Sequence, residues 1–303
     1  MEFNSPERPL TSNTVAGYRG RFAPSPSGLL HFGSLIAALA SFLDAKAHQG
    51  KWLVRIEDID PPRELTGAST NILKTLDAYG LHWDEEVRYQ SQQSERYQAL
   101  LSALKKQQLS YYCQCTRAQI KQVGGIYQGH CKPLSLPAQD SAIRLINHFA
   151  IHTFDDIFQG SVTCDINLAQ EDFIIHRKDG LFAYQLAVVA DDIEQGITHV
   201  IRGCDLLEPT ARQLTLFKTL QHNAPQFGHV PLAVTKQGYK LSKQNKAPAI
   251  DINKPQASLI AALKFLGQKP ENQLVHASVN EIIYWAITHW QRNYVPKMAQ
   301  IVI

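Results

Sequence analysis

A loop of small residues between a strand-like segment and a helical segment offers the first candidate chemistry. The strand-like residues 18–22 run into Pro24 to Gly28, and a helical pattern starts near Gly33. Unpaired backbone N–H groups and the dipole at a helix start favour an anion such as a triphosphate, and glycine lets a nucleotide approach the backbone closely. An ordinary strand-to-helix turn with a buried His31 is the other interpretation, and these residues alone leave both open.

A second loop carries two lysines that lie three residues apart. Lys240 and Lys243 fall between Gly238 and Lys246, after a β-like run at residues 231–235. Lysine ammonium groups are mobile point charges that could hold phosphates. Because a lysine-rich loop by itself is more often a solvated surface, this loop gains meaning only together with other motifs.

Three cysteines form a third candidate site. Cys113, Cys115 and Cys131 lie within nineteen residues of one another, and three thiolates need one more ligand to complete a tetrahedral zinc site. Coordination chemistry favours His130 as that ligand, but its adjacency to Cys131 makes simultaneous chelation awkward, and Tyr127 is the other candidate. Three free cysteines in a loop are the alternative interpretation.

The elements that would position these groups alternate between strands and helices. Apolar residues recur at three- and four-residue steps in the first helix, which predicts one buried face. The alternation predicts an α/β fold with a parallel sheet of Rossmann type. The predicted helices are residues 33–48, 66–79, 94–108, 182–194 and 210–221, and the predicted strands are 18–22, 52–57, 142–146, 173–175, 198–202 and 231–235.

Length and composition limit the number of domains and the class of protein. The 303 residues suit two domains or one domain with a large insertion, and 44% hydrophobic with 19% charged residues is a globular composition. The longest apolar run, 35–43, is shorter than the ~20 residues of a membrane span. Without a recognisable secretory signal, and with an odd set of five cysteines, we expect a cytoplasmic protein in which Cys164 and Cys204 are core residues. The net charge of +3 neither requires nor excludes a nucleic-acid partner.

Two segments, taken together, resemble the signature sequences of class I aminoacyl-tRNA synthetases: His31-Phe32-Gly33-Ser34 and Lys240-Leu241-Ser242-Lys243-Gln244. Ser34 stands where the general signature has a second histidine, which is common in the glutamyl branch. Gln244 stands where the signature ends in serine, so any role of that position is weakened while both lysines are retained. The resemblance to the glutamyl branch rests on the stretches 21–28, 55–60 and 201–205, and it covers residues 18–246.

Recognition of glutamate requires guanidinium groups for its carboxylates and an acceptor for its ammonium group. Arg21, Arg202 and Glu57 supply these groups at predicted strand ends, where open α/β sheets bind ligands. The resemblance implies that Arg21 and Arg202 meet the glutamate carboxylate, that Glu57 takes the ammonium group and that Tyr184 lines the pocket. It also assigns to the glutamate site the segment Phe22, Ala23, Pro24 and Ser25.

The implied reaction is attack of a glutamate carboxylate on the α-phosphorus of ATP. The resemblance implies that His31 hydrogen-bonds the phosphate region, that Lys243 stabilises the developing charge and that Lys240 assists. Gly33 and Ser34 complete the ATP site, and Mg²⁺ would be held mainly by the phosphates. In the same branch a tyrosine before the last cysteine completes a structural zinc site, which implies Tyr127 beside Cys113, Cys115 and Cys131.

Only 59 residues follow Gln244, whereas glutamyl-tRNA synthetases carry a longer anticodon-binding region there. We therefore expect a lead-in at 1–17, the two catalytic halves at 18–108 and 181–246, a zinc-bearing, acceptor-binding insertion at 109–180 and a short helical region at 247–303. The chain resembles instead the truncated paralogues that attach glutamate to queuosine in the anticodon loop of tRNA(Asp). Glutamylation of the 3′ end of tRNA(Glu), or a non-catalytic zinc-bearing RNA-binding role, are the alternatives. We expect a monomer.

Overall fold

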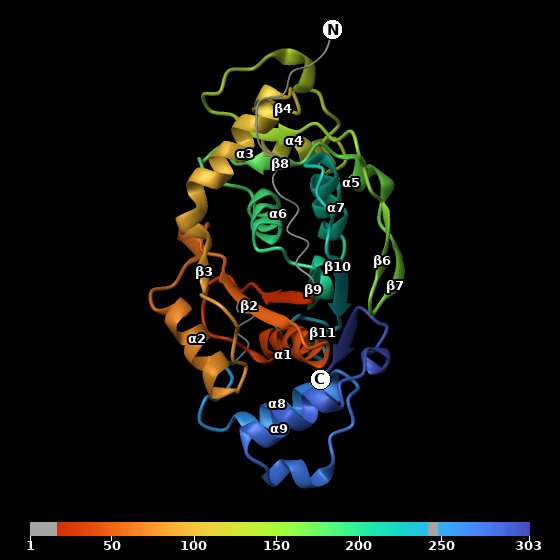
Figure 1. Ribbon diagram of the computed structural model, residues 1–303. Coiled ribbons are helices and arrows are strands. Elements are labelled where there is room, and N and C mark those ends of the chain that lie inside the picture. Colours follow the sequence, from red (N-terminus) through yellow and green to blue (C-terminus); the bar gives the residue numbers. More distant parts are fainter. Residues whose placement is uncertain (1–16, 242–247) are drawn as a thin grey trace.

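The computed structural model describes residues 17–241 and 248–303 (Figure 1). The main sheet has the strand order β3-β2-β1-β9-β10-β6-β7, and its neighbouring strands are parallel except for the antiparallel pair β6 and β7. Five neighbouring strands, β3, β2, β1, β9 and β10, follow the Rossmann order 3-2-1-4-5 when these five alone are numbered in chain order. The predicted fold class is therefore confirmed. The strands are β1 (Arg19–Phe22), β2 (Lys51–Ile56), β3 (Arg88–Tyr89), β6 (Thr153–Asp156), β7 (Gly160–Thr163), β9 (His199–Gly203) and β10 (Gln226–Val230).

Helix α1 (Phe32–Ala47) follows the first loop, as its apolar spacing predicts. Its inner face, including Leu35, Leu39 and Leu43, is fully buried because apolar residues three and four apart share one face of a helix. The other helices of the catalytic core are α2 (Ala68–Ala78), α3 (Ser94–Lys106), α6 (Tyr184–Glu194) and α7 (Pro209–Thr219). Each boundary of these helices lies within two residues of the predicted one. The largest differences are at residues 66–67, 107–108, 182–183 and 220–221, which were predicted to be helical and are not.

The cysteine-bearing segment forms a small sheet of its own at the upper end of the molecule in Figure 1. Strand β5 (Ala142–Leu145) lies between β4 (Ser110–Cys113) and β8 (Ile174–His176), and both pairs are antiparallel. Helices α4 (Arg117–Gln122) and α5 (Ile166–Gln170) flank this sheet. The β6–β7 hairpin belongs to the same stretch of sequence but extends the main sheet through β10.

The C-terminal residues close the lower end of the molecule (Figure 1). Helices α8 (Pro255–Phe265) and α9 (Val279–Thr288) share a hydrophobic cluster with α1. On and after α9, Ile282, Ile283, Ala286 and Trp290 are buried. The final strand, β12 (Gln300–Val302), pairs with β11 (Leu232–Val234) in a separate parallel ribbon.

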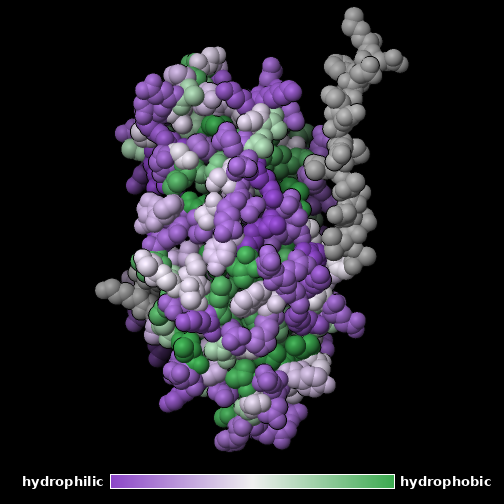
Figure 2. Space-filling model, turned by 60° about the vertical axis from the view of Figure 1, so that its left-hand side comes forward, coloured by the Kyte–Doolittle hydropathy of each residue, from purple (hydrophilic) through white to green (hydrophobic). Residues whose placement is uncertain are grey.

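The surface and the helix lengths agree with the composition. Figure 2 shows one face on which hydrophilic side chains dominate and hydrophobic ones form smaller patches. In the part of the chain that the structure describes, every helix is too short or too polar to cross a membrane. Of the two isolated cysteines, Cys164 is buried as expected, whereas Cys204 is only partly buried.

Candidate active site

Three charged side chains meet at the carboxyl ends of neighbouring strands. Arg21 lies near the end of β1, Glu57 directly follows β2, and Arg202 lies near the end of β9. Their exposed fractions are only 3%, 8% and 5%. Since charged groups are rarely buried without a purpose, this cluster at the Rossmann switch point is the strongest candidate for a ligand site.

Arg21 is held in place by an acidic residue that sequence analysis did not single out. Its Nε and Nη2 donate to the two carboxylate oxygens of Asp192, each at 3.2 Å. Asp192 also accepts from Nη1 of Arg55 at 2.8 Å. Burial opposes ionisation of Asp192, but Arg21 and Arg55 outweigh it and hold its pKa below the usual range. Asp192 therefore fixes the direction in which Arg21 presents its remaining N–H groups.

Glu57 is a buried carboxylate with spare accepting capacity. Its Oε1 has no hydrogen-bond partner within residues 17–241 and 248–303, although Nη2 of Arg55 lies 3.5 Å away. Burial raises the pKa of Glu57 to about 6, with Arg55 and Arg21 acting in the opposite direction. An ammonium ion placed at Oε1 would satisfy this oxygen and restore the lower pKa.

Arg202 is the matching cation. Its Nε donates to His229 at 3.0 Å and its Nη2 donates to Thr210 at 2.7 Å. Its Nη1 is buried and finds no acceptor among the described side chains and backbone. A buried N–H without a partner is costly unless a ligand supplies one, and a carboxylate is the acceptor that suits a guanidinium best.

Tyr184 is the first residue of helix α6, and all three charged groups affect its pKa. Burial raises the pKa of Tyr184, Glu57 adds to the shift, and Arg202 and Arg21 oppose it. The electrostatic influence of all three groups indicates that the phenol lies close to the charged cluster. Phe22, by contrast, is part of the hydrophobic core and stacks on Trp52 at 6.3 Å between ring centroids, so its side chain faces away from the charged cluster.

The start of α1 and the described first residues of the lysine loop, Lys240 and Leu241, come together in space. His31 caps α1 by accepting from the backbone N–H of Ser34 at Nδ1, which leaves the proton on Nε2. A Cβ added to Gly33 would lie 3.1 Å from the carbonyl oxygen of Leu241, so the glycine permits the lysine loop to approach the helix start. Lys240 pairs with Asp205.

The remaining predicted residues belong to the phosphate site (Lys243) and to the glutamate site (Ala23, Pro24 and Ser25). Lys243, together with Gln244, lies outside the described residues. Ala23 and Pro24 are partly buried and Ser25 is exposed. The carbonyl oxygen of Pro24 accepts from the backbone N–H of Glu57 at 3.0 Å, which ties the small-residue loop to the end of β2.

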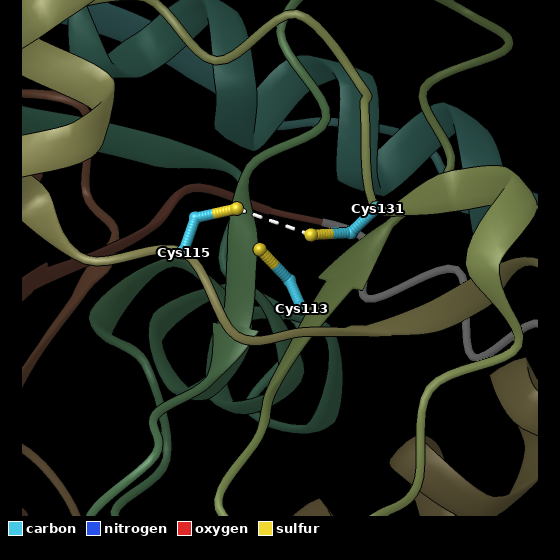
Figure 3. A group of neighbouring side chains, drawn as sticks. All are labelled: Cys113, Cys115 and Cys131. Atoms are coloured by element: carbon cyan, nitrogen blue, oxygen red, sulfur yellow. Dashed lines mark hydrogen bonds between the residues drawn. The ribbon is translucent and has the colours of Figure 1, made fainter.

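The three predicted cysteine ligands converge, as Figure 3 shows. Their Sγ atoms all lie within 4.8 Å of one another, and those of Cys115 and Cys131 are 3.1 Å apart. Tetrahedral zinc with Zn–S bonds of about 2.3 Å requires sulfurs roughly 3.8 Å apart, so the donor set fits zinc. Both fourth-ligand candidates are adjacent: the Tyr127 hydroxyl accepts from the backbone of Cys131 at 2.9 Å, and His130 Nε2 lies 2.8 Å from Cys115 Sγ.

Arg144 backs the cysteine cluster and was missed by sequence analysis. Its Nε lies 3.2 Å from the Sγ of Cys113, and its guanidinium stacks 3.7 Å over the Tyr127 ring. The signal that could have found it is a lone arginine in the apolar strand Ala142–Leu145, since a buried arginine must have an anionic or polar partner. Asp156 on β6 and His229 on β10 were missed for a different reason, because neither strand was predicted.

Comparison with known proteins gives a consistent result. The family model for class I tRNA synthetases (E and Q), catalytic domain, matches residues 18–291. A glutamyl-Q tRNA(Asp) synthetase of Colwellia psychrerythraea is 67% identical over 97% of both chains. Proteins of the same name are 54% identical in Escherichia coli K12, over 94% of this chain and 93% of that one, and 53% identical in Salmonella paratyphi A, over 95% and 97%.

Two solved structures share the fold. A glutamate tRNA ligase from Elizabethkingia meningosepticum, in complex with its amino acid, has a TM-score of 0.77 and 25% identity over 93% of this chain. A glutamate-tRNA synthetase from Elizabethkingia anophelis has a TM-score of 0.78 and 25% identity over 95%. The chain spans 66% and 68% of the length of these two proteins. It belongs to the class I tRNA synthetases of the glutamyl and glutaminyl type, within the group of ligases named glutamyl-Q tRNA(Asp) synthetase.

Proposed function

We propose that this ligase activates L-glutamate with ATP in the absence of tRNA and then transfers the glutamyl group to queuosine in the anticodon loop of tRNA(Asp). The observation that carries the activation step is a pair of buried atoms, Nη1 of Arg202 and Oε1 of Glu57, for which the described residues supply no hydrogen-bond partner. One is a cationic donor and the other an anionic acceptor, which are the complements of a carboxylate and an ammonium group.

The activation step needs no covalent bond to the protein. A carboxylate oxygen of glutamate attacks the α-phosphorus of ATP, the bond to the bridging oxygen breaks, and pyrophosphate leaves with that electron pair. Catalysis then consists of positioning and charge neutralisation. Arg21 and Arg202 orient the substrate, Nε2–H of His31 donates to the phosphates, and Lys243 with Lys240 neutralises the leaving pyrophosphate. Magnesium bound to the phosphates would supply further neutralisation.

The choice of queuosine rests on the relatives. Those named glutamyl-Q tRNA(Asp) synthetase match this chain over nearly their whole length, 97% in the first case, whereas the two glutamate-tRNA ligases are longer than this chain. A hydroxyl of the queuosine cyclopentene ring would attack the carbonyl carbon of glutamyl-adenylate and release AMP. We infer that the cysteine site is structural, because zinc held by Cys113, Cys115, Cys131 and Tyr127 would have no open coordination position.

Labelled glutamate, ATP and total tRNA from strains with and without queuosine test the proposal directly. We expect label on tRNA(Asp) only when queuosine is present, and we expect it to persist after the 3′-terminal adenosine is removed. Labelling that ignores queuosine and requires an intact 3′ end of tRNA(Glu) would instead support the alternative acceptor. Pyrophosphate exchange that depends on glutamate but not on tRNA is the separate test of activation.

A further inference from the structure

A buried chain of three polar side chains crosses three adjacent strands behind the candidate glutamate site. Asp156 ends β6, His229 belongs to β10, and Arg202 belongs to β9. His229 and Arg202 are direct partners in the sheet register. The exposed fractions of Asp156 and His229 are 5% and 0%, so these two reach the substrate only through Arg202.

The hydrogen bonds fix the tautomer of His229. Nε of Arg202 donates to Nε2 of His229 at 3.0 Å, and because an arginine N–H can only donate, Nε2 must offer its lone pair. The imidazole proton is therefore on Nδ1, which donates to Oδ2 of Asp156 at 2.5 Å. Burial lowers the pKa of His229, Asp156 counteracts this and Arg202 reinforces it, which keeps the ring neutral.

Asp156 is in turn held as an anion. Its Oδ1 accepts three backbone N–H groups, from Phe158 at 3.0 Å, Gln159 at 2.9 Å and His229 at 3.1 Å. Burial opposes its ionisation, but the hydrogen bond from His229 and these backbone donors outweigh burial and hold its pKa below the usual range. A carboxylate with this many donors cannot rotate, so the ring of His229 cannot rotate either.

Counting donors shows what this chain does for Arg202. A guanidinium has five N–H groups. Nε–H goes to His229, and the two of Nη2 go to the carbonyl oxygen of Leu206 at 3.2 Å and to Thr210 at 2.7 Å. The two on Nη1 are buried and unmatched in the part of the protein that the structure describes. The guanidinium is thus held on three sides with a single nitrogen left for a ligand.

We propose that Asp156 and His229 are positioning residues that orient Arg202 toward a carboxylate of the amino-acid substrate. This inference rests on the proposed activation of glutamate. If the proton moved to Nε2 of His229, that N–H would face the N–H of Arg202, donor against donor, and the guanidinium would rotate away from its present direction. The negative charge of Asp156 stabilises the tautomer that prevents this, as the aspartate does in the serine-protease triad.

The first test uses Asp156→Asn, which keeps the shape of the side chain but presents an N–H to Nδ1 and so favours the wrong tautomer. In pyrophosphate exchange with the full chain, we expect the KM for glutamate to rise about tenfold or more. The KM for ATP should stay within about twofold, because the relay touches only the amino-acid side of the site. His199→Gln, on the same strand as Arg202 but stacked on Tyr18 at its other end, is the matched control and should change neither value.

The second test reads the tautomer directly and works even if a variant fails to fold. In ¹⁵N-histidine-labelled wild-type protein, the His229 signals should show a protonated Nδ1 and an unprotonated Nε2. Asp156→Asn should reverse that pattern. A wild-type ring protonated at Nε2 or at both nitrogens would overturn the proposal. So would an Asp156→Asn variant whose two KM values rise alike or whose KM for glutamate is unchanged.

These readouts also separate this inference from the proposed function. Wild-type protein that catalyses no glutamate-dependent exchange would reject glutamate activation itself, whatever the tautomer of His229. Wild-type protein that is active, with an Asp156→Asn variant that binds glutamate equally well, would reject only the relay.

Discussion

Arg144 places its Nε 3.2 Å from the Sγ of Cys113, so the cysteine cluster has a fixed cation at its back. With zinc bound, three thiolates and one dication would carry a net negative charge, which the neighbouring guanidinium would offset. The same guanidinium covers the Tyr127 ring and donates to the backbone of Asp172 at 2.6 Å. Through Arg144, strand β5 therefore contacts both Cys113 on β4 and Tyr127 in the loop after α4.

We expect about one zinc per chain in the wild-type protein and a sharp loss in Cys113→Ser. Arg144→Gln should retain zinc at saturation but bind it about 10- to 100-fold more weakly, because groups around a metal's ligands tune its affinity by that amount. Competition with a colorimetric chelator measures both the zinc content and the zinc affinity. Arg96→Gln, which removes a partly exposed ion pair with Glu194, serves as the control. Equal affinity in the Arg144 and Arg96 variants would contradict the role of Arg144.

The pKa of Glu57 near 6 predicts an acid limit to activity. Below that pH the carboxyl gains a proton and loses its attraction for an ammonium group, so kcat/KM for glutamate should fall about tenfold per pH unit. Glu57→Gln should remove this limb and lower kcat/KM at pH 7.5 by about tenfold to a hundredfold. Pyrophosphate exchange across pH 5–8 measures it, with the exposed Glu86→Gln as control.

Ionisation of Glu57 favours activity but lowers the stability of the folded protein. Burial raises the pKa of Glu57 in the folded protein above its unfolded value, so the ionised side chain destabilises the fold above pH 6 and this cost is relieved as the pH falls through 6. Glu57→Gln should therefore leave Tm at pH 7.5 unchanged or raise it. A large drop in Tm would show that Glu57 is needed for the fold rather than for the ligand.

Under the proposed mechanism, Lys243→Ala should slow pyrophosphate exchange by about a hundredfold or more, because it would remove a cation that neutralises the departing pyrophosphate. Lys236→Ala deletes an equal charge from the same stretch of chain and is exposed, so it should leave the rate nearly unchanged. Rapid-quench measurement of adenylate formation separates this effect from product release. A rate in Lys243→Ala equal to that of Lys236→Ala would remove the lysine loop from the mechanism.

Asp44 should prove essential to the stability of the whole chain. Its buried carboxylate accepts from Tyr18, from Trp290 Nε1 at 2.9 Å, and from Arg292 at 2.7 and 2.8 Å. Asp44→Ala should lower the free energy of unfolding by about 3–5 kcal/mol, as expected for breaking a buried ion pair. Calorimetry should show a Tm lower by roughly 10 °C. The exposed Asp77→Ala should shift Tm little, and equal shifts in the two variants would contradict the prediction.

The sequence was most informative where local pattern and chemistry coincide. The period of apolar residues located α1, and the parallel sheet brought Arg21, Glu57 and Arg202 together because all three lie at or next to the end of a predicted strand. The cysteine cluster was also predictable, since three thiols so close in sequence can meet across a short loop. The choice between Tyr127 and His130 depends on ring placement within that loop, and both remain beside the sulfurs.

Residues that act through other residues were not predictable. Asp192 sits in an apolar helix where an acid normally faces solvent, and its burial follows only from the arginines on β1 and β2 that meet it. His229 was missed because β10 is five residues long and contains a glycine, which gives little strand signal. Pairing across the sheet is a long-range property, and local composition does not encode it.

The pairing of β12 with β11 determines where a tag or a label can be attached without affecting the lysine loop. The backbone N–H of Ile303 donates to the carbonyl of Val234 at 3.0 Å, and Val234 is bridged to Lys240 at the start of the lysine loop. An affinity tag, a fluorescent fusion or a surface anchor joined after Ile303 would therefore begin beside the base of that loop. Such additions are expected to perturb the ATP kinetics of an otherwise native enzyme, so a labelling site on the exposed face of α2 is the better choice for immobilisation.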